Sequence, residues 1–182
     1  MKHLFLAGVI TITLFSIGAR LAEGKTDFRK VSWGMSPEQV KKTEPASQLT
    51  GEMPEVLIYE GEIARINASI FYLFDDGKLN RGLYSIETAQ QDTIVKDYET
   101  IRTFMLKQYG DPSEVKMGPK DEMYTGDLDP ANPEDLYDLV LRKSISPETI
   151  WERGKTRIYL RLIEKDGRLA VMIDYIIFPA EK

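Results

Sequence analysis

The segment TRIYLRLIEKDGRLAVMIDYII, residues 156–177, decides the fold class. Apolar side chains recur at every second position on both sides of Asp166-Gly167, and a period of two is typical of half-buried β-strands. Aspartate followed by glycine tolerates the positive φ angles of a tight hairpin turn. Residues 149–153, followed by Gly154-Lys155, add a further strand and turn. The C-terminal region therefore predicts a three-stranded antiparallel meander.

The middle of the chain repeats this pattern. Side chains alternate over residues 64–74, Asp76-Gly77 forms a second hairpin turn, and residues 78–87 return. Gly61 predicts an earlier turn or bulge, so that another meander begins at Val56. The side chains expected on its buried face are Ala64, Ile66, Ala68, Ile70, Tyr72 and Phe74.

Three segments carry helix signals. Residues 36–39 read Ser-Pro-Glu-Gln, a capping box with proline at the first helical position. Residues 94–109 place apolar side chains at spacings of three and four, with Asp92 as the N-cap and Gly110 as the C-terminal cap. Asn132-Pro133 predicts the start of a shorter third helix.

These elements predict an α+β fold with a mainly antiparallel β-sheet, made of two β-meanders, and with helices packed on one face. Residues 25–182 have a length that suits one domain. Each meander follows a helical segment. A helix-plus-meander duplication is therefore a hypothesis, although the loops differ in length and Asp-Gly hairpins are common.

Residues 1–24 have the features of a signal peptide. A positively charged start precedes an apolar run over residues 4–17, and Ala22 and Gly24 are small residues where a signal peptidase reads them. We expect cleavage after Gly24; cleavage after Ala19 and an uncleaved anchor are the alternatives. The run is shorter than the roughly 20 apolar residues of a membrane span. The sequence therefore predicts an exported protein, periplasmic or extracellular.

The chain has one histidine, His3, and no cysteine. Because His3 lies in the predicted signal peptide, the mature chain would lack imidazole and thiol groups. Their absence argues against thiolate catalysis, histidine acid–base catalysis and ordinary zinc sites. The formal net charge of −5 and the lack of a basic cluster argue against nucleic acid as a partner. No cofactor is predicted.

Alternation leaves polar side chains on the second face of the sheet. They form either a recognition surface or an ordinary solvated sheet face. The candidate binding residues are Arg65, Asn67, Arg157, Tyr159 and Arg161.

The acidic stretch over residues 121–138 offers a calcium loop as a second candidate. Asp127, Asp129 and Asp138 match the first, third and twelfth positions of such a loop. Ala131, however, stands where an oxygen ligand is needed, and the turn glycine is missing. The stretch therefore favours a solvated acidic loop before a helix, and no metal site is predicted.

No nucleophile elbow, phosphate-binding loop or metal-ligand cluster is present in the sequence. The prediction is a non-enzymatic binding or interaction module whose partner is another envelope protein or a small ligand. One alternative is a hydrolase of the glycosidase type, because two carboxylates suffice for that chemistry. The other is a secreted enzyme inhibitor, which would use a long exposed loop at residues 117–133.

The capped helix start over residues 34–40, GMSPEQV, and the later YGDP at residues 109–112 resemble a known pattern. They are similar to small bacterial envelope proteins grouped with the outer-membrane assembly lipoprotein BamE and the β-lactamase-inhibitor-protein-like fold. The resemblance covers about a dozen residues, and the chain departs from it in lacking a lipidated cysteine and in its longer mature region. It implies an antiparallel sheet after the helix, an envelope setting and binding to another protein. It carries over no functional residue.

Overall fold

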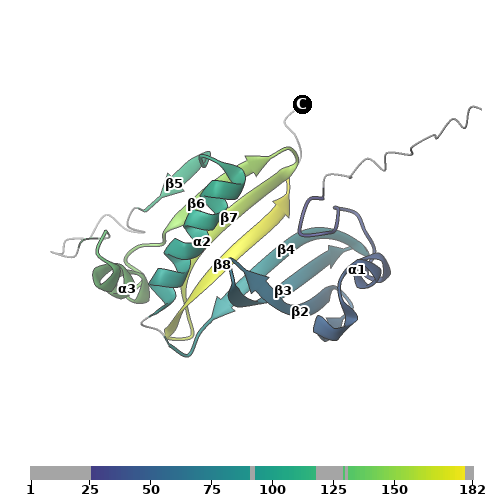
Figure 1. Ribbon diagram of the computed structural model, residues 1–182, viewed down its shortest axis with the longest axis horizontal. Coiled ribbons are helices and arrows are strands. Elements are labelled where there is room, and N and C mark those ends of the chain that lie inside the picture. Colours follow the sequence, from purple (N-terminus) through teal and green to yellow (C-terminus); the bar gives the residue numbers. More distant parts are fainter. Residues whose placement is uncertain (1–25, 91–92, 118–128, 130, 179–182) are drawn as a thin grey trace, which may run out of the picture.

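One antiparallel β-sheet runs through the computed structural model (Figure 1). The structure describes residues 26–90, 93–117, 129 and 131–178. The predicted signal peptide and Asp92 lie outside the described residues. The eight strands are β1 Leu49–Met53, β2 Val56–Ile63, β3 Ile66–Asp75, β4 Lys78–Glu87, β5 Glu114–Lys116, β6 Glu148–Arg153, β7 Thr156–Lys165 and β8 Arg168–Ile177.

The order of the strands is β1-β2-β3-β4-β8-β7-β6-β5. The meander β2-β3-β4 and the meander β6-β7-β8 thus join through their last strands, β4 and β8. Pairing of these two strands runs from Arg81 opposite Ile176 to Glu87 opposite Ala170. This confirms the predicted α+β fold with a mainly antiparallel sheet. Two copies of a helix-plus-meander unit, joined through their last strands, would also give this strand order, and the duplication stays a hypothesis.

The turn between β2 and β3 corrects one expectation. Ala64 and Arg65 have φ angles of 53° and 67°, as a two-residue hairpin turn requires. Gly61 is not a turn residue; it lies inside β2 opposite Ala68. A Cβ atom on Gly61 would lie 2.7 Å from Cδ1 of Ile70, so any larger residue there would displace the end of the Ile70 side chain. The expected strand over residues 64–74 therefore begins only after the turn.

Helices α1 Pro37–Thr43 and α3 Pro133–Leu141 begin where the capping signals predict them, whereas Thr93 and not Asp92 precedes α2 Ile94–Tyr109. Ser36 caps α1 with a complete capping box, and the side chain of Asn132 accepts hydrogen bonds from the first backbone N–H groups of α3. The residue before α2 is Thr93, which makes no side-chain capping hydrogen bond. A short 3₁₀ helix, η1, spans Ala46–Gln48.

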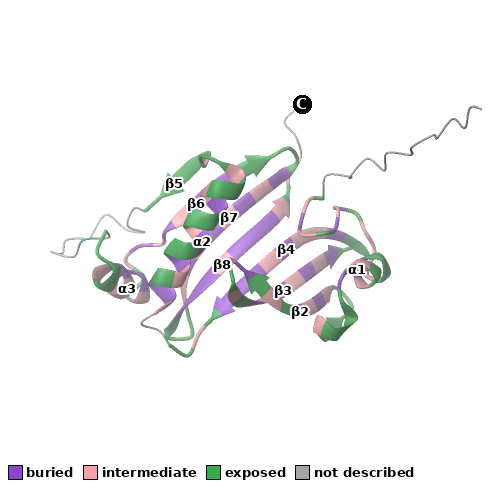
Figure 2. Cartoon of the chain, viewed as in Figure 1, coloured by how far each residue is buried: buried purple, intermediate pink, exposed green. Residues whose placement is uncertain are grey.

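The helices lie on one face of the sheet. Helices α2 and α3 pack against β7 and β8, while α1 lies at the other end of the sheet, near β2 and β3 (Figure 1). Buried and half-buried residues alternate along β7, as the period-two pattern predicts (Figure 2). We call the face of the sheet on which the helices lie the covered face, and the opposite face the open face.

Phe28, in the segment before α1, fills the covered face where the two meanders meet. Its ring centroid lies 5.3 Å from that of Tyr72, 5.4 Å from that of Tyr84 and 5.0 Å from that of Tyr175. A Cβ atom on Gly82 would lie only 2.2 Å from Cδ1 of Phe28. The ring therefore rests directly on the backbone of β4.

Polar contacts also hold the segment before α1 against the rest of the protein. Arg29 donates two hydrogen bonds of 3.2 Å to the buried carboxylate of Glu44, at the end of α1. The Tyr72 hydroxyl donates to the same carboxylate at 2.7 Å. Nε1 of Trp33 donates to Oγ1 of Thr156 on β7 at 2.9 Å. The N-terminal segment is thus tied to both meanders.

We predict that Gly82→Ala lowers the free energy of unfolding by about 1–3 kcal/mol, because the new methyl group overpacks the site of Phe28. Chemical denaturation of the single and double variants measures this effect. In a Phe28→Ala background the same substitution should cost little, since the clashing ring is gone. An equal cost in both backgrounds would show that the clash is not the cause.

The buried tyrosines make the free energy of unfolding depend on pH in the alkaline range. Burial raises the pKa values of Tyr84, Tyr98, Tyr109 and Tyr175 above the usual value, and burial together with the bond to Glu44 does the same for Tyr72. The phenols of the unfolded chain lose protons near pH 10, whereas those of the folded chain retain them. The unfolded state then binds fewer protons, so stability falls as the pH rises.

We therefore predict that the free energy of unfolding is constant with respect to these groups below about pH 9 and declines above about pH 10. Ultraviolet absorbance of tyrosinate, followed together with circular dichroism, measures the two events. Most of the tyrosinate signal should appear with unfolding. A full tyrosinate signal from a chain that is still folded would contradict the prediction.

Candidate functional site

The open face is built from side chains that alternate with the buried ones. Arg157, Tyr159 and Arg161 all point to this face from β7, as predicted, and all three are half-buried. The guanidinium of Arg161 lies 4.4 Å from the centroid of the Tyr159 ring. Arg157 donates to Glu152 on β6 at 3.0 Å.

The other two predicted residues are not brought to this cluster. Asn67 is exposed on β3, opposite Glu62, and β4 and β8 separate its strand from β7. Arg65 is in the β2–β3 turn, where it lines a shallow hollow with Lys96 and Phe104 of α2. Its assignment to the second face was therefore wrong, because the alternation stops at the turn.

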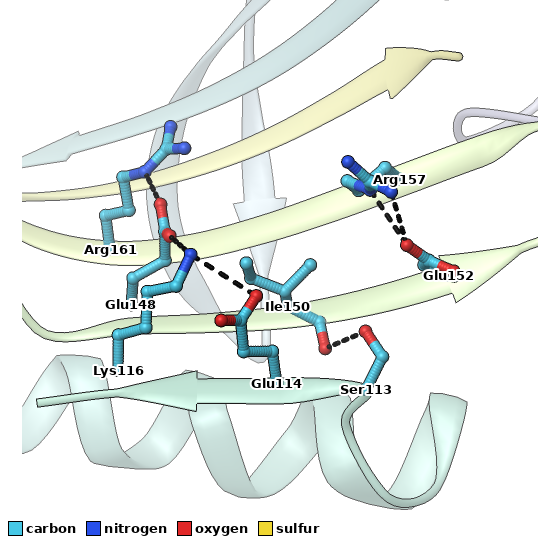
Figure 3. A network of polar contacts seen from close by, with 8 residues as sticks. All are labelled: Ser113, Glu114, Lys116, Glu148, Ile150, Glu152, Arg157 and Arg161. Atoms are coloured by element: carbon cyan, nitrogen blue, oxygen red, sulfur yellow. Dashed lines mark hydrogen bonds and ion pairs between the residues drawn. The ribbon is translucent and has the colours of Figure 1, made fainter. Parts of the chain in front are cut away.

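A chain of ion pairs, which we call the charge ladder, crosses five strands of the open face. Lys116 of β5 lies 3.4 Å from Glu148 of β6, which pairs with Arg161 of β7. Nη1 of Arg161 lies 3.1 Å from Asp174 of β8, and Nη2 of Arg81 on β4 lies 2.6 Å from the same carboxylate. Figure 3 shows Lys116, Glu148 and Arg161 in one row. The ladder therefore links both meanders.

Asp174 is the centre of the ladder. Its side chain is only 3% exposed and carries Arg81 on one oxygen and Arg161 on the other. A buried carboxylate is costly unless it is paired and hydrogen-bonded. Asp174 therefore fixes the positions of both guanidinium groups on the open face.

Apolar side chains occupy the open face beside the ladder. Ile58, Phe71 and Leu83 lie opposite one another on β2, β3 and β4, and Leu83 lies opposite Asp174. Each of the three is half-buried. Val56, Leu73, Met172 and Ile176 are the half-buried apolar residues around them. We call these seven residues the apolar patch.

A cleft of about 580 Å³ opens on the covered face, between α2, the N-terminal segment and the β2–β3 turn. Because β4 and β8 both contribute to it, we call it the seam cleft. Tyr84, Ile158 and Tyr175 line it from the sheet, and Phe104, Gln108 and Tyr109 line it from α2. Arg29 and Arg153 contribute positive charge.

The seam cleft also contains carboxylates, Asp27 and Glu62, as a carboxylate hydrolase would need. Asp27, however, accepts the backbone N–H of Trp33 at 3.0 Å and lies 3.5 Å from Nζ of Lys155. Burial raises the pKa of Asp97, but this residue is not part of the cleft lining. Asp27 is thus held by partners within the protein, and the hydrolase alternative stays a prediction.

The calcium candidates are only partly within the described residues, since Asp127 lies outside them. Asp129 accepts the N–H of Ala131, and Asp138 pairs with Arg142 at 3.5 Å within the last turns of α3. In the described part of the chain, no three histidine, cysteine, aspartate or glutamate side chains are grouped to hold a metal ion.

Comparison of the chain with models of protein families, with curated proteins and with solved structures found no match. The resemblance to the BamE group therefore stays a prediction. Among the described residues, no helix is long and apolar enough to cross a bilayer.

Four members of the charge ladder were not among the residues predicted from the sequence: Lys116, Glu148, Asp174 and Arg81. A signal for Asp174 was present, because an aspartate inside the apolar run of residues 169–177 must either be exposed or be paired. No local signal identifies its partners, since Arg81 is 93 positions away along the chain.

We predict that Asp174→Ala lowers the free energy of unfolding by about 2–4 kcal/mol, because it removes the shared acceptor of two guanidinium groups. The exposed Glu152→Ala is the matched control; it also breaks an arginine pair on the open face and should change stability little. Thermal and chemical denaturation of both variants measure the difference. Equal, small effects would show that the ladder is an ordinary surface network.

Proposed function

We propose that this protein is an exported, non-enzymatic binding module that uses the open face to bind another protein of the cell envelope or of the extracellular space. The observation that carries the proposal is the apolar patch beside the charge ladder, on the sheet face opposite the helices. Export rests on the predicted signal peptide.

The composition of the open face supports a protein partner. Protein interfaces combine an apolar centre with a polar rim, and arginine and aromatic side chains are enriched in them. Phe71 and Leu83 supply an apolar centre, and Arg81, Arg157 and Arg161 are polar groups at its border. Contiguous apolar area on a protein surface often marks an interaction site.

The ion pairs of the open face add specificity. Asp174 holds Arg81 and Arg161 in place before binding, so a partner would not have to order these long side chains. A partner carboxylate could add to this network, whereas a basic surface would be repelled. The expected partner therefore presents an apolar ridge bordered by acidic residues.

The test is capture of a partner from an extract of the cells that produce the protein, followed by binding of the purified pair. Phe71→Lys and Leu83→Lys, made as separate variants, each place one charge in the apolar patch. Each should weaken binding of the purified partner at least tenfold, because the new charge would be desolvated. Val115→Lys is the control, since Val115 is an exposed apolar residue on the opposite side of the edge strand β5.

Retained binding in both patch variants would overturn the proposal, provided that circular dichroism shows them folded. Loss of binding in the Val115 control as well would show a non-specific effect of added charge. If the captured partner is an enzyme whose activity the protein lowers, the inhibitor alternative is the specific form of this function.

A further inference from the structure

The seam cleft has the size of a small-molecule site. Its volume of about 580 Å³ falls within the roughly 300–1,000 Å³ that is typical of ligand pockets. The aromatic rings of Tyr84 and Tyr175 belong to the part of its lining that comes from the sheet. The rest of the lining includes charged and polar side chains, and polar groups of this kind can orient a ligand.

Among the described residues, one positive charge in the cleft has no acidic partner. Arg29 is bound to Glu44, and Asp27 is paired with Lys155. Arg153, at the end of β6, makes no ion pair with any residue that the structure describes; its guanidinium lies 5.8 Å from the ring centroid of Tyr109. Glu62, the remaining charged group of the lining, is on β2, and four strands lie between β2 and β6 in the sheet. The Arg153 end of the cleft is therefore positive.

A phenol beside Arg153 can donate a hydrogen bond to a ligand. The hydroxyl oxygens of Tyr109 and Tyr175 are 3.0 Å apart, so one of the two protons lies between them. Tyr175 is buried and Tyr109 only half-buried, so donation by Tyr175 leaves the proton of Tyr109 for the cleft. Burial raises the pKa values of both phenols, which keeps them protonated at neutral pH.

An apolar side chain completes the lining. Phe104 of α2 is 40% exposed, although it is a large aromatic residue on a helix that buries its other face. It lines the seam cleft beside Gln108. A ligand with an apolar body would cover this ring, and burial of apolar area is favourable.

We propose that the seam cleft binds a small organic anion with an aromatic or apolar body, its carboxylate on Arg153 and Tyr109 and its body on Phe104 and the tyrosine rings of the sheet. Arginine suits this role because its planar guanidinium donates two parallel hydrogen bonds to a carboxylate. The site is separate from the open face, so binding of a protein partner and binding of the anion can be tested independently.

The experiment uses probes of matched shape and different charge. Phenylacetate, 3-phenylpropionate and indole-3-acetate are titrated into the isotope-labelled protein, each beside its neutral amide, with chemical shifts recorded by NMR. We expect at least one acid to shift signals of residues in the seam cleft and to bind at least tenfold more tightly than its amide. Acetate tests whether the aromatic body is needed and should bind more weakly than the best aromatic acid.

Two variants locate the anion. Arg153→Gln should weaken binding of the best acid at least tenfold and leave binding of the amide unchanged, while Arg168→Gln, at the β7–β8 turn, should change neither. Arg153→Gln should also leave the melting temperature almost unchanged, because Arg153 makes no ion pair with a described residue. Tyr109→Phe should weaken binding of the acid severalfold; its melting temperature is measured because the bond to Tyr175 is lost.

Three outcomes would overturn the proposal. The first is that none of the three acids shifts signals of the cleft at concentrations of tens of millimolar. The second is equal binding of acid and amide, which would show that no cation selects the ligand. The third is equal loss of affinity in Arg153→Gln and Arg168→Gln, which would show general attraction to positive charge. None of these results bears on the binding of a protein to the open face.

Discussion

The pairing of β4 with β8 is the constraint on which the rest of the structure depends. These strands come from different meanders, and each would be an unpaired edge without the other. Their contact makes one continuous sheet and brings Tyr84 and Tyr175 together on the covered face, where Phe28 packs on both rings. On the open face it brings Arg81 to Asp174. Both candidate sites exist because of this pairing.

The two faces differ because different kinds of chain segment cover them. On the covered face, α2 packs over β7 and β8, whereas the segment around Phe28 packs on β3, β4 and β8. The seam cleft is the space that remains where these two covers do not meet. The open face has no helix over it in the described residues, and its side chains must stabilise one another. They do so through the charge ladder at one end and the apolar patch at the other.

Local signals in the sequence were sufficient for much of the fold. The Asp-Gly turns, the capping box at Ser36 and the Asn132-Pro133 helix start depend on residues within a few positions of one another, and the structure contains all of them. The position of the first hairpin turn failed for a physical reason. Glycine is the usual turn signal, but Gly61 lies inside a strand with the end of the Ile70 side chain against it, a contact that no local pattern reveals.

The sequence by itself determined the α+β class, the two meanders with their Asp-Gly turns, the starts of α1 and α3 and the absence of thiol groups, because period, capping and composition are local properties. Only the tertiary structure decided that β4 meets β8, that Asp174 holds Arg81 and Arg161, and that Arg153 and Tyr109 share a cleft. These contacts join segments far apart in the chain. Their geometry depends on strand order and register, which are set by the packing of the whole sheet.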